Sequence, residues 1–126
     1  MSYFKETKKN TPTRSKEDLA DQEIKRICSF FLNCTCLYMD TKIASIELSF
    51  ILLEIIKNEA SKEDGDTRLA LMAHNYLNRI KVVTDKLDKV YEDVEAGIIP
   101  VAVANKLFIK TYKLFKEAEL DVKSLS

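Results

Sequence analysis

The sequence predicts an all-α protein, an up-down-up-down antiparallel four-helix bundle that follows a flexible basic N-terminal tail. The chain has 126 residues, of which 46% are hydrophobic, so it is long enough for one compact domain and too short for two ordinary ones. Only two glycines and two prolines are present, which leaves little material for the tight turns of a β-sandwich or β-barrel. Apolar residues recur at helical spacing in four successive stretches.

The tail is predicted from the first fourteen residues. Lys5, Lys8, Lys9 and Arg14 outnumber Glu6 there, and the segment has no apolar period. Order is expected to begin at residue 15. Residues 1–14 are therefore predicted to be disordered and residues 15–126 to form a single helical-bundle domain.

The first helix is expected to run from Ser15 to a turn near Asp40. Its seam, the row of apolar side chains facing the core, alternates steps of four and three: Ala20, Ile24, Ile27, Phe31, Cys34 and Tyr38. Continuing this phase would place Thr41 and Ser45 in the core, which is why a turn is predicted. Without the turn, the first two helices would form one rod and another chain would have to complete the bundle.

The second helix is expected over about residues 42–61, with Asp40 or Thr41 as its cap. The predicted seam consists of Ile43, Ile46, Phe50 and Leu53, but Leu48, Ile51, Leu52, Ile55 and Ile56 are apolar too. The polar ridge is narrow, and a helix that is apolar nearly all round is expected to be buried nearly all round.

Two further helices follow a polar connection that contains Gly65. The third is expected to start at Asp66 or Thr67 and to end at Gly97, with the seam Leu69, Ala73, Tyr76, Ile80, Val83, Leu87, Val90 and Val94. Pro100 suits the first turn of the fourth helix. The seam of this helix is Val101, Ala104, Phe108, Thr111, Phe115, Ala118, Val122 and Leu125.

The sequence does not predict an enzyme. It has no glycine-rich phosphate loop, no zinc-ligand spacing and no nucleophile elbow, and its single histidine, His74, is expected on the outer side of the third helix. No catalytic, cofactor-binding or metal-binding residue is predicted. Cys28 and Cys34 are expected to be buried as small apolar residues and Cys36 to lie outside. A Cys34-x-Cys36 site for Cu(I) would require a loop there, because the two side chains diverge on a helix.

A protein partner is predicted at the hairpin between the first two helices. Residues 27–39 carry no charge, and the start of the second helix is also apolar on most sides, so an exposed apolar patch is expected. The predicted partner-binding residues are Phe30, Leu32, Cys36, Leu37, Met39 and Ile51. Since symmetric association is the commonest kind, the expected partner is a second copy, which makes a homodimer. The function predicted is that of an adaptor, a regulator or inhibitor, or a small subunit of a larger assembly.

An alternative function is contact with nucleic acid. The twenty basic and twenty acidic residues cancel, so any attraction must be local. The fourth helix carries Lys106, Lys110, Lys113 and Lys116 on its outer side, and the basic tail could add to them. No arginine or aromatic platform accompanies these lysines.

The expected location is the cytoplasm. Three cysteines within nine residues leave at least one thiol without an intramolecular disulfide, which fits a reducing compartment. The N-terminus does not resemble a secretory signal, and no uncharged run approaches the roughly 20 residues that cross a bilayer. No membrane association is predicted.

Overall fold

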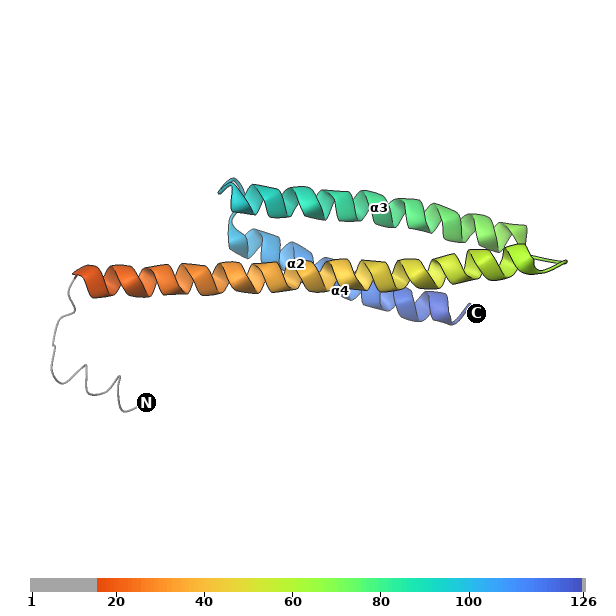
Figure 1. Cartoon of the computed structure of the whole chain (residues 1–126), viewed down its shortest axis with the longest axis horizontal. Coiled ribbons are helices and arrows are strands. Elements are labelled where there is room, and N and C mark those ends of the chain that lie inside the picture. The colour runs from red at the N-terminus through yellow and green to blue at the C-terminus, as the bar shows by residue number, and fades with distance from the viewer. Residues whose placement is uncertain (1–15, 126) are drawn as a thin grey trace, which may run out of the picture. The chain divides into compact units, whose positions relative to one another are not determined.

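The computed structural model describes residues 16–125, which form three α-helices and no strand. The helices are α2 (Lys16–Ser61), α3 (Thr67–Glu95) and α4 (Val101–Lys123) (Figure 1). The all-α prediction is confirmed, but the four-helix count is wrong, because the first two predicted helices are one continuous helix. The predicted N-terminal tail lies outside the described residues.

The predicted turn near Asp40 is absent because the core accepts the two hydroxyl residues that follow it. Thr41 and Ser45 are buried. The Thr41 Oγ1 lies 2.7 Å from the carbonyl oxygen of Leu37 and 3.1 Å from that of Phe108, so its proton always has an acceptor. Ser45 Oγ donates to the Lys42 carbonyl at 2.6 Å. A buried hydroxyl with a hydrogen-bond acceptor costs little, so the helix continues through both residues.

The chain divides into two units within α2, Met1–Leu32 and Asn33–Ser126. In the first unit the described residues are helical, and Arg26 pairs with Glu23 one turn earlier. Cys28, which was expected to be buried, is exposed. Because the Glu23–Arg26 pair is itself well exposed, it adds little to the stability of this segment.

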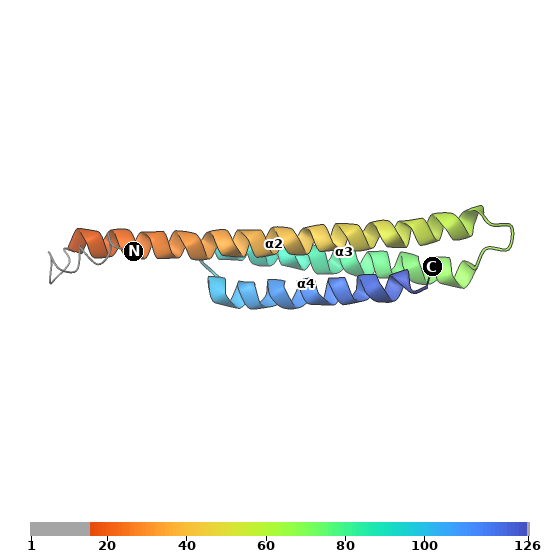
Figure 2. The ribbon, with the colours of Figure 1, turned by 90° about the horizontal axis from the view of Figure 1, so that it is seen from below.

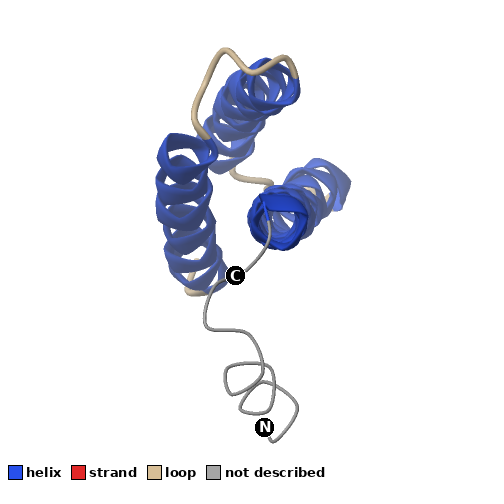
Figure 3. Cartoon of the chain, turned by 90° about the vertical axis from the view of Figure 1, so that its left-hand side faces the viewer, coloured by secondary structure: helices blue, strands red, loops and turns tan. Residues whose placement is uncertain are grey.

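The second unit is built from three helices. Residues 33–61 of α2, α3 and α4 run side by side, and each helix is antiparallel to its neighbour in sequence (Figures 1 and 2). Seen nearly end-on, they occupy the corners of a triangle (Figure 3). The buried apolar residues are Cys34, Ala44, Leu48, Leu52 and Ile55 from α2, Ala73, Ile80, Leu87 and Val94 from α3, and Ala104, Phe108, Phe115 and Val122 from α4.

The predicted helix ends on either side of α3 are confirmed. The Asp66 side chain caps α3 by accepting a hydrogen bond from the Leu69 backbone N–H at 3.1 Å. Gly97 follows the last turn with φ of +76°, the left-handed conformation that glycine adopts without steric cost. Pro100 is the N-cap residue of α4, one position before the helix begins.

The predicted seams locate the buried residues of α3 and α4 but are wrong for much of α2, where Ile24 and Ile27 of the first predicted seam are exposed. Every buried apolar residue of α3 and α4 belongs to the seams expected from the spacing. In α2, however, Ile43, Ile46, Phe50 and Leu53 are exposed, and Leu48 lies in the core instead. Residues 42–56 carry apolar residues on two opposite sides, so periodicity alone does not decide which side faces α3 and α4.

Candidate protein-contact surface

An apolar stripe follows the side of α2 that faces away from α3 and α4. We call it the outer stripe and define it by Cys36, Met39, Ile43, Ile46, Phe50 and Leu53, which alternate steps of three and four. The five large residues are 49–63% exposed, and Cys36 is exposed as well. Because i, i+3, i+4 and i+7 share one helix face, the six side chains form one continuous row.

The outer stripe differs from scattered apolar residues because of its length and regularity. From Cys36 to Leu53, every position of the three-four alternation is apolar, and Lys57 is the first charged residue in the row. At ~1.5 Å per residue the row is about 25 Å long. Single exposed apolar residues need no explanation, whereas a contiguous exposed row marks a contact surface.

The predicted partner-binding residues fall at different places on α2. Cys36 and Met39 belong to the outer stripe, and Leu32, which is exposed, occupies the next position of the same alternation toward the N-terminus. Leu37 and Ile51 are half-buried and do not belong to the row. Phe30 is exposed but lies outside the alternation. The hairpin that was expected to bring these six residues together is not formed.

Four residues of the outer stripe were missed as contact residues. Ile43, Ile46, Phe50 and Leu53 were assigned to the core, although they are exposed. A sequence signal for them existed, because they continue the spacing of Leu32, Cys36 and Met39 without interruption. The predicted turn near Asp40 divided this row in two and hid its continuity.

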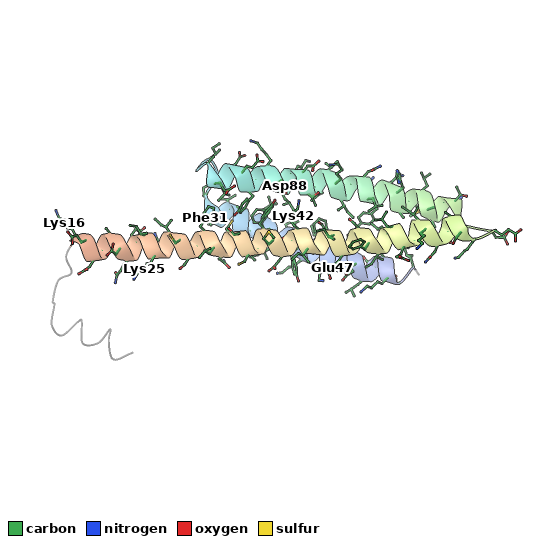
Figure 4. The ribbon with its side chains drawn as sticks, in the orientation of Figure 1. Lys16, Lys25, Phe31, Lys42, Glu47 and Asp88 are labelled. Atoms are coloured by element: carbon green, nitrogen blue, oxygen red, sulfur yellow. The ribbon has the colours of Figure 1, made fainter. Side chains whose placement is uncertain are left out.

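Charged residues border the outer stripe differently on its two sides. Asp40, Glu47 and Glu54 recur every seven residues along the side nearer α4, and Lys42 lies on the side nearer α3. Lys42 Nζ is 2.8 Å from an Asp88 carboxylate oxygen, and Figure 4 shows the two side chains meeting between α2 and α3. Glu47 lies 3.7 Å from Lys116 Nζ of α4. These pairs are consistent with a rotation of α2 that turns the outer stripe outward.

A tyrosine cluster secures α2 to α3 behind the outer stripe. The rings of Tyr38 and Tyr91 stack with centroids 4.3 Å apart, Tyr38 donates a hydrogen bond to Asp88, and the hydroxyls of Thr35 and Tyr91 are 2.7 Å apart. Burial, followed by the hydrogen bond to Asp88 and its negative charge, raises the pKa of Tyr38 to about 12. Hydrogen bonds from Lys42 and then Tyr38 lower the pKa of Asp88.

We expect Tyr38 to ionise only as the pH approaches about 12, because burial and Asp88 favour its neutral phenol. Because the folded state favours the neutral phenol, its contribution to stability is complete below pH 10.0 and is lost as the pH rises through about 12. The ultraviolet absorbance of tyrosinate, followed against pH, measures this step. Tyr38→Phe should abolish the ionisation step near pH 12, and Asp88→Asn should lower the pKa of Tyr38, whereas Asp85→Asn on the exposed side of α3 should leave it unchanged. An absorbance step near pH 12 that survives Tyr38→Phe would contradict the assignment.

The lysines of α4 are partly neutralised. Lys106, Lys110 and Lys113 are exposed, as the sequence predicts. Lys116 is half-buried, lies 3.6 Å from Glu119 as well as close to Glu47, and sits 6.0 Å from the centroid of the Tyr112 ring. The nearby charges of Glu119 and Glu47 raise the pKa of Lys116. Of the four lysines predicted to form a row, only three are therefore exposed cations.

Groups suited to chemistry are dispersed over the described residues. His74 is exposed, and within residues 16–125 no three or more His, Cys, Asp or Glu side chains gather closely enough to hold a metal ion. Burial raises the pKa of the Cys34 thiol, which disfavours the reactive thiolate. In the same part of the chain, no helix combines the length and apolar character needed to cross a membrane.

The comparisons with known proteins return no relative. No protein-family model matches the chain, and searches of curated proteins and of solved structures find no significant match.

Proposed function

We propose that this protein acts through protein–protein contact rather than catalysis, and that it self-associates through the outer stripe of α2. The observation that carries this proposal is the uninterrupted exposed row from Cys36 to Leu53 on the helix that also supplies core residues. Such a contact module would serve as an adaptor, a regulator or a small subunit of a larger assembly.

The helical packing of α2 supports this proposal. Leu48, Leu52 and Ile55 already bury one side of the helix against α3 and α4, so the fold does not need the outer stripe for its own core. Five large apolar side chains nevertheless remain 49–63% exposed there. Burying them releases water from apolar surface, at about 25 cal/mol for each Å² removed. A second α2 helix offers a complementary row of the same length.

The lysine face of α4 supports nucleic-acid contact less well. A surface that binds along a phosphate backbone presents several free cations in a row. Here Lys116, the last lysine of the row, is paired with Glu47 and Glu119. Lys106, Lys110 and Lys113 remain as an exposed group. The salt dependence of binding distinguishes the two functions, since phosphate binding weakens steeply with ionic strength and apolar association does not.

Light scattering over a wide concentration range tests the self-association. We expect the wild type to form dimers and the variant Ile43→Glu/Phe50→Glu to be a monomer with unchanged helical circular dichroism, because a charge in the apolar row cannot be buried without a partner. The matched control is Leu71→Glu/Leu120→Glu, which alters two equally exposed apolar residues on α3 and α4 and should remain dimeric. A wild type that stays monomeric at every concentration would refute the proposal.

A further inference from the structure

We infer that the second copy places its α2 parallel to and in register with the first, so that Cys36, Ile43 and Phe50 each face their own counterparts across a two-fold axis. This inference rests on the proposed self-association and adds its geometry. Parallel and antiparallel pairs would bury the same outer stripe, so apolar burial alone does not choose between them. The spacing of the outer stripe and the charged residues beside it decide between the two orientations.

The outer stripe has the spacing of a coiled-coil seam. In the seven-residue repeat written a to g, Cys36, Ile43 and Phe50 occupy position a, and Met39, Ile46 and Leu53 occupy position d. Two helices whose apolar residues alternate in this way pack knobs into holes along the whole row. The repeat breaks at Lys57, a charged residue at the next position a, which marks the end of the seam. Only another helix matches such a surface along its length.

The charges beside the seam favour the parallel orientation. Asp40, Glu47 and Glu54 all occupy position e, and Lys42 occupies position g. In a parallel pair, position g of one helix lies beside the position e that is five residues further along the other helix. This places Lys42 beside the partner copy's Glu47, and the two-fold axis makes this contact occur twice. In an antiparallel pair, position e faces position e, so Asp40 of each copy would lie beside Glu47 of the other. Two negative charges placed side by side, Asp40 of one copy and Glu47 of the other, oppose association.

The present contacts of these side chains leave room for the new pair. Glu47 is 51% exposed, and its distance of 3.7 Å from Lys116 is longer than a hydrogen bond. Lys42 donates to Asp88, but an ammonium group has three donors and can serve a second carboxylate. Helices α3 and α4 contact other sides of α2, through Asp88 and Lys116 respectively. Helices α3 and α4 of the first copy therefore leave the outer stripe open to the second copy.

Disulfide cross-linking of the full chain distinguishes the two orientations. In a background of Cys28→Ser/Cys34→Ala, Cys36 is the only thiol, and in the parallel pair the two copies of it face each other. Oxidised glutathione provides the oxidant: two protein thiols and one glutathione disulfide give one interchain disulfide and two reduced glutathione molecules. We expect a covalent dimer on a non-reducing gel. A second variant that adds Cys36→Ser and Leu53→Cys should also cross-link with itself.

The antiparallel pair predicts the opposite pattern. Position 36 would then face position 53 of the other copy, so each single-thiol protein would remain uncrosslinked, and only the protein with both Cys36 and Leu53→Cys would form covalent dimers. That result, with a dimer seen by light scattering, would overturn the parallel geometry and keep the proposed self-association. A monomer by light scattering would overturn both.

A charge reversal gives a second, independent measure. Glu47→Lys should raise the dissociation constant of a parallel dimer by about tenfold, because it turns two attractive contacts with Lys42 into two repulsive ones. In an antiparallel dimer the same change would place a lysine beside Asp40 and lower the dissociation constant. Glu63→Lys, in the connection after α2, is the control and should change neither. The direction of the change in affinity decides between the two geometries.

Discussion

Leu48→Ala is expected to lower the free energy of unfolding by about 2–5 kcal/mol at every protein concentration. Leu48 is fully buried between the helices of the Asn33–Ser126 unit, so the truncation leaves a cavity in the core. For a unit of this size, a loss of that order is a large fraction of the total stability. Urea unfolding followed by circular dichroism measures the loss.

The matched variant is Phe50→Ala, two residues along the same helix. Phe50 is 63% exposed and belongs to the outer stripe. We therefore expect its truncation to destabilise the protein at high concentration, where dimers form, and to have little effect once dilution separates the copies. A large loss that persists on dilution would show that Phe50 faces the core. It would restore the seam of Ile43, Ile46, Phe50 and Leu53 expected from the sequence.

Asp40→Pro is expected to lower the stability by roughly 3 kcal/mol or more, which corresponds to a fall in melting temperature of about 10–20 °C. Asp40 is exposed, so the substitution removes no core packing. Its effect comes from the backbone, because proline lacks the N–H that an interior helical residue donates and clashes with the carbonyl group one turn earlier. Thermal unfolding followed by circular dichroism measures this cost.

Two further proline variants calibrate this result. Glu47→Pro lies inside a helix whether or not a turn exists at Asp40, so it should be strongly destabilising in either case. Thr67→Pro should be tolerated, because Thr67 is the first residue of α3 and Asp66 before it is extended, with φ of −79° and ψ of 97°. If Asp40→Pro behaves like Thr67→Pro, a turn exists near Asp40 and α2 is not continuous.

The candidate contact surface could be predicted only in part. The uncharged run up to Met39 pointed to α2, and Cys36 and Met39 do lie in the outer stripe. Ile43, Ile46 and Phe50 were placed in the core instead. Their spacing fits a core seam as well as it fits an exposed seam, since a periodic row reports that a face is apolar and not what covers it.

The sequence by itself determined the helical class and the ends of α3. Scarce glycine and proline, the Asp66 cap and Gly97 are local signals, and local backbone preferences act without knowledge of the rest of the chain. The seams of α3 and α4 were also readable, because each of these helices has a single strongly apolar side.

Only the tertiary structure decided the continuity and the rotation of α2. Thr41 remains helical in the core because the Phe108 carbonyl group of α4 and the Leu37 carbonyl group lie within reach of its hydroxyl. Of the two apolar sides of α2, the inner one is selected by partners on other helices, where Asp88 holds Lys42 and Tyr38. The contacts between helices join residues at least 46 positions apart. No local pattern contains them, because they arise only when the helices pack together.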